Sequence, residues 1–216
     1  MRDFFNLDNP FMIFMADMTD VIILNVVCLI CCLPIITIGP AITALHYVTL
    51  KMAKDEEGYV LKDFFKSFKE NLKQSTIIWL LFLAITLFFY FDIKIIQEGP
   101  LPVPTFVKNI IYASYLLCCT TIMYTFPVLA RFSNSISKTI KNAFLMSMIH
   151  IVRTIIMAII YLIPVVLIPL NYNFIAVFLL VGLAGPAYLN GHIWKGIFKR
   201  YEPEEIRAEE TEESII

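Results

Sequence analysis

Residues 143–170 read AFLMSMIHIVRTIIMAIIYLIPVVLIPL, an apolar run in which Arg153 is the only residue among Asp, Glu, Lys and Arg. A helix needs roughly 20 apolar residues to cross a bilayer core about 30 Å thick. Three further runs, Thr76–Phe91, Phe106–Ala130 and Asn173–Tyr188, have a similar composition, and an interrupted run extends from Val21 to Met52. The sequence therefore predicts a multi-pass membrane protein.

The composition of the whole chain supports the same class. Of its 216 residues, 59% are hydrophobic and 16% are charged, whereas roughly a quarter of a soluble domain is charged. The mean hydropathy is +0.76. The formal net charge of −1 indicates neither a nucleic acid nor a polyanionic partner. We expect lipid, not a large soluble core, to cover most of the apolar surface.

Along the chain, connecting segments that are rich in basic residues alternate with segments that are poor in them, as cytoplasmic and external loops do. Rich segments hold Lys51, Lys54, Lys62, Lys66, Lys69 and Lys73; then Arg131, Lys138 and Lys141; then Lys195, Lys199, Arg200 and Arg207. Of the intervening segments, one holds Lys94 and Lys108 as its only basic residues, and the other has no charged residue. This alternation predicts a cytoplasmic carboxyl terminus.

The first apolar run, Val21–Met52, is longer than one span and is interrupted by Pro34, Gly39 and Pro40. Proline removes a backbone donor, and glycine permits a change of direction. One interpretation is a single broken span, which gives five crossings and an external amino terminus. The other is a hairpin, which gives six crossings. We favour five, because the second limb from Ala41 to Met52 is short for a crossing.

A similar Gly-Pro interruption recurs near the carboxyl end. Gly39-Pro40-Ala41 followed by His46 matches Gly185-Pro186-Ala187 followed by His192 at the same spacing. Transporters use paired broken helices to form midplane sites, although such breaks are also ordinary kinks of membrane helices. We expect helices to begin or break near Pro34–Pro40 and near Gly185-Pro186.

The segment between the first two runs is amphipathic. Its apolar side chains follow the i, i+3, i+4, i+7 spacing of one helical face, and its lysines share another face. The apolar set is Leu61, Phe64, Phe65, Phe68 and Leu72, and the basic set is Lys62, Lys66, Lys69 and Lys73. This pattern predicts an interfacial helix, with its rings in the acyl boundary and its lysines among anionic headgroups. It would serve either as a lipid anchor or as a docking platform for a partner.

Several short motifs together resemble the YesL-like family of bacterial membrane proteins. They are Leu33-Pro34-Ile35-Ile36-Thr37-Ile38-Gly39-Pro40-Ala41, Glu56-Glu57-Gly58, Phe64-Phe65-x-x-Phe68-Lys69-Glu70-Asn71-x-Lys73-Gln74, Trp79, Phe126-Pro127 and Gly185-Pro186-Ala187. The family has no established biochemical role. Its genes tend to lie beside sugar-uptake ABC transporters and polysaccharide-degrading enzymes, so the resemblance implies a role in carbohydrate uptake.

Residues for catalysis are not evident. The sequence has no nucleophile motif, phosphate loop or metal-ligand cluster, so we expect no catalytic, cofactor or metal site and no enzyme activity. A polar pathway through the bilayer would have to use His46, Arg153 and His192. Arg153 snorkels at the cytoplasmic boundary if the crossing is Ile151–Leu170. It needs a carboxylate or a wet cavity if the crossing begins at Ala143.

These observations predict an all-α, single-domain transmembrane bundle over residues 1–201 of a bacterial plasma-membrane protein, followed by an acidic, disordered cytoplasmic tail at 202–216. The expected partners are the lipid bilayer and a sugar ABC transporter or another membrane protein, but no nucleic acid. The leading hypothesis is an accessory component of carbohydrate uptake. The alternative is a small solute transporter or channel. A polar, water-accessible cavity lined by His46, His192 or Arg153 would favour the alternative.

Overall fold

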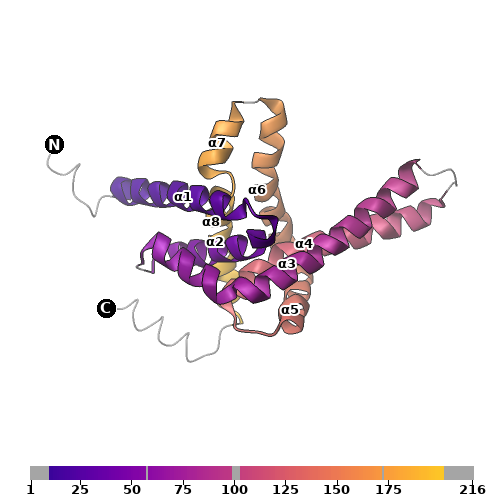
Figure 1. The fold of residues 1–216 in the computed structure, drawn as a ribbon, viewed down its shortest axis with the longest axis horizontal. Helices are drawn as coiled ribbons and strands as arrows, with labels where there is room; N and C mark the ends of the chain where they lie inside the picture. Colours follow the sequence, from indigo (N-terminus) through magenta and orange to yellow (C-terminus); the bar gives the residue numbers. More distant parts are fainter. Residues whose placement is uncertain (1–9, 57, 99–102, 172, 202–216) are drawn as a thin grey trace.

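The fold was analysed in a computed structural model that describes residues 10–56, 58–98, 103–171 and 173–201. All regular structure in these residues is helical (Figure 1). The elements are α1 (Pro10–Cys32), the 3₁₀ turn η2 (Ile35–Thr37), α2 (Ile38–Ala53), α3 (Val60–Glu98), α4 (Thr105–Arg131), α5 (Ile136–Ile149), α6 (Ile151–Leu170), α7 (Phe174–Val181) and α8 (Ala184–Phe198). The acidic tail predicted for 202–216 lies outside the described residues, and the single-domain boundary at residue 201 stays a prediction.

The all-α transmembrane class is confirmed. Among the described residues, five helical segments are long and apolar enough to cross a membrane, namely α1, α2 (together with η2), α3, α4 and α6. The pair α7 and α8 forms one further candidate span with a bend of 51°. The predicted run Ala143–Leu170 is not one helix, because the chain breaks at His150 between α5 and α6.

The first apolar run is a helical hairpin, so the favoured interpretation of one broken span is wrong. The Cys28 thiol lies 3.8 Å from the carbonyl oxygen of Ala41, next to the turn. At the open end of the hairpin, Asp17 of α1 and Lys51 of α2 line the same cleft. The second limb is longer than expected because the helix begins at Ile38, before the Gly-Pro pair. This arrangement is the one that predicts six crossings.

Both Gly-Pro pairs lie at helix starts and do not kink continuous helices. Gly39 and Pro40 are the second and third residues of α2, and Gly185 and Pro186 hold the same positions in α8. Proline is tolerated there because the first amides of a helix have no intrahelical acceptor. Helices thus begin near both Gly-Pro pairs, and Pro34 lies between α1 and η2.

Helix α2 is the centre of the bundle and contacts α1, α3, α4 and α8. The contacts between α2 and α8 follow the same order along both helices. Gly191 lies against the Thr49 carbonyl, and Lys195 donates to the carbonyl oxygen of Ala53 at 3.0 Å. The two segments that share the Gly-Pro pattern thus lie side by side and run in the same sense. Their histidines differ, because His46 is buried and His192 is exposed.

The break between α7 and α8 is held by Asn25 of α1. The Asn25 Nδ2 donates to the carbonyls of Phe178 and Leu179 at 3.3 and 2.9 Å. Its Oδ1 accepts from the amides of Leu183 and Ala184 at 2.8 and 2.9 Å. One fully buried side chain therefore contacts four backbone groups at the break; the Phe178 carbonyl also accepts from the Gly182 amide, and the other three would be left unpaired without Asn25. In a lipid environment such groups are costly.

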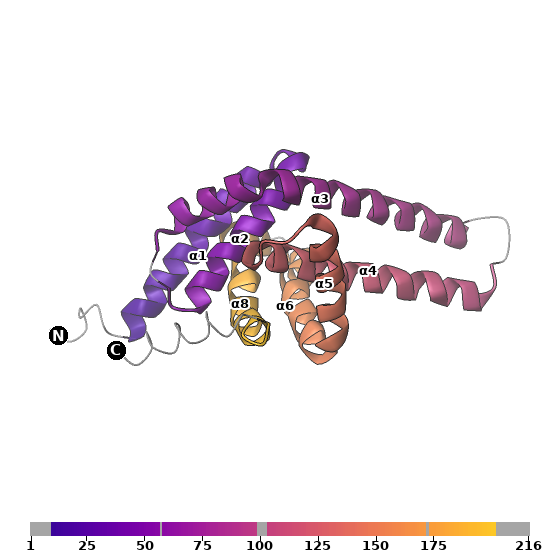
Figure 2. The ribbon, with the colours of Figure 1, turned by 90° about the horizontal axis from the view of Figure 1, so that it is seen from below.

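The amphipathic segment is the beginning of α3, a continuous helix of 39 residues, which is roughly 58 Å long at 1.5 Å per residue. The second half of α3 and α4 extend together from the bundle as a two-helix arm (Figure 2). Helices α6 and α7 form a second pair that projects in another direction (Figure 1). Large apolar side chains on both pairs are exposed, including Phe88 on α3 and Val165 on α6. Lipid is the natural cover for such surfaces.

The hairpin makes a topological prediction. A compartment-dependent reporter at the amino terminus and another inserted after Lys54 should report the same side of the membrane, because α1 and α2 run in opposite directions. A third reporter after Glu98, one further span along the chain, is the control and should report the opposite side. The hairpin would be incompatible with an amino-terminal signal that matches the Glu98 site and differs from the Lys54 site.

Candidate functional site

A charged cleft lies at the open end of the α1–α2 hairpin. It has a volume of about 860 Å³ and is bounded by the first half of α1, the end of α2, the α2–α3 connection and the start of α3. Its carboxylates come from Asp17, Asp20, Asp55, Glu56 and Asp63, and its ammonium groups come from Lys51, Lys62 and Lys66. Lining groups of both signs distinguish the cleft from the apolar remainder of the bundle. We refer to it as the hairpin cleft.

An ion pair forms one wall of the hairpin cleft. The Lys51 Nζ donates to Asp63 Oδ2 at 2.8 Å, and only 22% and 17% of the two side chains is exposed. Gly58 lies directly against the pair. A Cβ added there would overlap the Asp63 carboxylate and would lie 3.0 Å from the Lys51 Nζ. Gly58 therefore lets the α2–α3 connection approach the ion pair closely.

Helix α8 supports the same region from the other side. The Tyr188 hydroxyl donates to Asp17 Oδ2 at 3.0 Å. The Lys195 Nζ donates to the Ala53 carbonyl and lies 3.9 Å from Asp55 Oδ2. Asp55 has a φ of 59°, a left-handed conformation in which aspartate is one of the better-tolerated residues. The carboxyl-terminal helix thus fixes α1 and the end of α2 together.

The predicted docking face on α3 begins at the rim of the hairpin cleft. Lys62, Lys66, Lys69 and Lys73 are all exposed. The apolar face differs from the prediction: Phe64 is fully buried in the protein core, and Phe68 packs against that core, stacked on the Phe64 ring at 6.1 Å. Phe65 remains 44% exposed. The assignment of all three rings to the acyl boundary is therefore wrong, because α1 and α2 provide a protein surface for Phe64.

The residues proposed for a polar pathway are not brought together. Arg153 is exposed in the first turn of α6, which begins at Ile151 as the snorkelling interpretation requires. His192 is exposed on α8, and its Nδ1 lies 3.3 Å from the Tyr188 carbonyl oxygen of its own helix. His46 is buried and lines a different, mainly apolar cavity with Tyr161.

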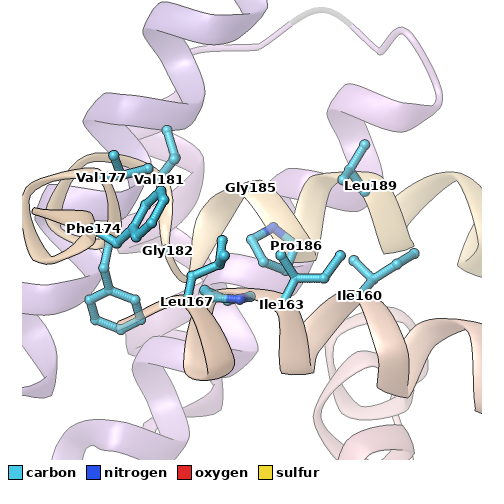
Figure 3. A pocket seen from close by; sticks show the side chains of 12 residues that line it. Ile160, Ile163, Leu167, Phe174, Val177, Val181, Gly182, Gly185, Pro186 and Leu189 are labelled. Atoms are coloured by element: carbon cyan, nitrogen blue, oxygen red, sulfur yellow. The ribbon is translucent and has the colours of Figure 1, made fainter. Parts of the chain in front are cut away.

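The second Gly-Pro break borders an apolar pocket of about 240 Å³ (Figure 3). Its wall comes from α6, α7 and the start of α8, and includes Leu167, Phe174, Gly185 and Pro186. Apart from the proline ring nitrogen, the side chains drawn there are hydrocarbon. In this part of the described chain the break does not create a polar site, since Asn25 already occupies the free backbone groups at 178–184.

Sequence reasoning missed the ion pair between Lys51 and Asp63, although both residues stand next to the Glu56-Glu57-Gly58 motif. A short connection with glycine between a helix that ends in lysine and one that begins with aspartate was the available signal. It also missed Tyr161 and Asn190. These two residues are polar positions within apolar runs, and such positions face protein more often than lipid. Among the described residues, the structure has no group of three or more His, Cys, Asp or Glu side chains suited to a metal ion.

The glycine at the ion pair gives a stability prediction. Gly58→Ala should displace Asp63 from Lys51 and lower the free energy of unfolding by about 1–2 kcal/mol, because the pair is a partly buried, charge-assisted hydrogen bond. Thermal unfolding in detergent measures this change. Gly196→Ala is the control, since a Cβ at this exposed helical site meets nothing within 4 Å and alanine is the better helix former. Equal shifts for both variants would contradict the close contact at Gly58.

The junction of α5 and α6 places a histidine among cations. Partial burial lowers the pKa of His150, and the charges of Arg153 and Arg200 lower this pKa further. The His150 Nε2 lies 3.2 Å from the Tyr201 hydroxyl. Since the folded state disfavours the imidazolium, its stability should fall as the pH decreases below about 6.5.

This environment gives a titration prediction. In NMR spectra of histidine-labelled protein, the His150 resonance, identified by its loss in His150→Gln, should have a midpoint below pH 6.5. Arg153→Gln should raise that midpoint, because it removes one repulsive charge. Lys138→Gln is the control for the loss of a positive charge elsewhere. A midpoint above 6.5, or no change in Arg153→Gln, would refute the electrostatic interpretation.

Comparisons with known proteins show that part of the chain is similar to a family of unknown function. The family model described as "Protein of unknown function, DUF624" matches residues 21–93, which include the α1–α2 hairpin, the α2–α3 connection and the lysine face. The chain is 27% identical over 120 residues to the "Uncharacterized protein YesL" of Bacillus subtilis (strain 168); the match covers 55% of this chain and 56% of that protein. No solved structure matches. The chain is therefore a multi-pass membrane protein that is similar to the DUF624 family over residues 21–93 and distantly homologous to YesL.

Proposed function

We propose that the protein is an accessory component of carbohydrate uptake that binds a partner membrane protein through the hairpin cleft and the adjoining lysine face of α3. The supporting observation is the concentration of exposed charge in one place: Lys62 and Lys66 line the hairpin cleft, and Lys69 and Lys73 continue this face along α3. Charged surfaces of this kind orient a partner and accelerate its association. The family match includes this region.

The orientation of this surface follows from its lysines. We propose that the hairpin cleft faces the cytoplasm, because basic residues concentrate in cytoplasmic connections. The end of α8 lies beside the same cleft through Lys195 and Ala53, so the carboxyl terminus belongs on the same side. This orientation would bring the lysine face to the side of the membrane on which anionic lipids and cytoplasmic subunits are found.

The carbohydrate assignment rests on the resemblance to the YesL-like family, whose genes tend to lie beside sugar-uptake ABC transporters. The geometry favours an accessory role over transport. His192 and Arg153 are exposed, and His46 lines a mainly apolar cavity. A solute pathway needs polar groups that face one another across the bilayer, and these three residues do not meet that condition.

The proposal is tested by reversing the charge of the lysine face. The triple variant Lys62→Glu, Lys66→Glu and Lys69→Glu should lose co-purification with the permease of the neighbouring sugar transporter and slow growth on that sugar. The paired variant Lys138→Glu and Lys141→Glu is the control, since both lysines are exposed on α5 and belong to another basic connection. Unchanged co-purification and growth in the triple variant, with normal membrane levels, would refute the proposal.

A further inference from the structure

A second cavity opens between α4 and α6, with α2 and α3 as its floor. Its volume is about 560 Å³, within the range of small-molecule sites. Most of its wall is apolar, with Ile42, Phe126 and Ala158 among the lining residues. Among the described residues that line it, none is Lys, Arg, Asp or Glu. We refer to it as the His46 cavity, after its most deeply buried polar side chain.

His46 contributes an unpaired polar atom to this cavity. The side chain is only 5% exposed, and its Nδ1 has no hydrogen-bond partner among the described residues. The Nε2 lies 3.5 Å from the Tyr161 hydroxyl, at the limit of a hydrogen bond, and the two rings meet edge to face with centroids 6.4 Å apart. Buried polar groups are rarely left unpaired, because such a group loses its hydrogen bonds to water without compensation.

The mouth of the His46 cavity is on the lipid-exposed surface. Leu116 of α4 and Leu162 and Val165 of α6 line the cavity and are exposed by 66%, 55% and 59%. An apolar rim of this kind is suited to contact with lipid hydrocarbon and not with water. His46 is the ninth residue of the 16-residue helix α2, so its Cα lies about 10–12 Å along the axis from either end of this helix. A ligand that reaches His46 therefore enters sideways from the hydrocarbon region of the bilayer.

We propose that the His46 cavity binds a single-chain, uncharged amphiphile from the bilayer, with a hydroxyl group at His46 and its hydrocarbon chain along the apolar wall. Because Nδ1 has almost no exposed surface, the imidazole must turn toward the cavity before the hydroxyl donates to this atom or accepts from it, according to the tautomer. A phosphate or carboxylate head does not fit, because the wall offers no cationic partner and a buried, unpaired charge is strongly disfavoured. This site is separate from the hairpin cleft and does not depend on the role proposed for that cleft.

The experiment uses photolabelling of the full chain in nanodiscs with a hexadecanol that carries a diazirine. Mass spectrometry should locate the label on 116–126 of α4 and 158–165 of α6. Oleyl alcohol should compete with the label, whereas oleate at pH 8, with the same chain and a charged head, should compete at least about tenfold less well. Equal competition by oleate, or label spread evenly over the exposed apolar helices, would overturn the proposal without any variant.

Two variants test the wall and the polar atom separately. Ala158→Trp should fill the cavity and abolish the label, and Ile159→Trp, on an exposed neighbouring position, is the matched control. His46→Phe should reduce alcohol labelling about threefold to tenfold, the usual effect of one buried hydrogen bond, and leave labelling by a diazirine-bearing hexadecane unchanged. Full labelling of a monodisperse Ala158→Trp protein, or an equal loss of both labels in His46→Phe, would overturn the assignment. If either variant fails to fold, competition on the wild type decides.

Discussion

The close approach of α2 to its neighbours is the constraint on which the bundle depends. A Cβ on Gly39 would lie 2.5 Å from the Ser75 carbonyl oxygen of α3, and one on Gly191 would lie 2.8 Å from the Thr49 carbonyl oxygen of α2. Small residues at these crossings let two backbones meet, which is how membrane helices gain packing energy when lipid removes the hydrophobic difference between protein and surroundings. The remaining helices are placed around this centre.

The polar groups of the structure lie where they find partners or where they leave the apolar bundle. Charges collect at the open end of the α1–α2 hairpin, where Lys51 and Asp63 neutralise each other. Most buried hydroxyls of the described bundle are paired locally or across helices, as in the 2.7 Å hydrogen bond between Tyr124 and Thr154, whereas Thr76 Oγ1 has no partner among the described residues. His46 is an exception, because it lies at mid-helix depth with one nitrogen unpaired among the described residues. The hairpin cleft and the His46 cavity are thus chemically distinct. The cleft is charged, and the cavity is mainly apolar with one buried polar side chain at His46.

Much of the architecture was predictable because hydropathy records contact with lipid directly. The apolar runs and the helix starts near the Gly-Pro pairs followed from residue type and spacing alone, whereas the position of Arg153 was left open between the start and the middle of a span. The hairpin did not, because the length of its second limb depends on where α2 begins, and hydropathy around Ile38 does not mark a helix start. The burial of Phe64 could not be predicted from the sequence either. Helical spacing shows that two faces differ, but it does not show whether lipid or another helix covers the apolar one.

The four hydrogen bonds of Asn25 carry a consequence for biogenesis. At the α7–α8 break, Asn25 of α1 pairs with two carbonyls and two amides, of which the Phe178 carbonyl also accepts from the Gly182 amide. Helix α1 precedes the α7–α8 pair in the chain, so the Asn25 side chain is synthesised before the break that it pairs with. The break cannot be satisfied within α7 and α8 alone, because the Leu179 carbonyl and the Leu183 and Ala184 amides would remain unpaired in lipid. The broken span is thereby stabilised only once it has packed against α1.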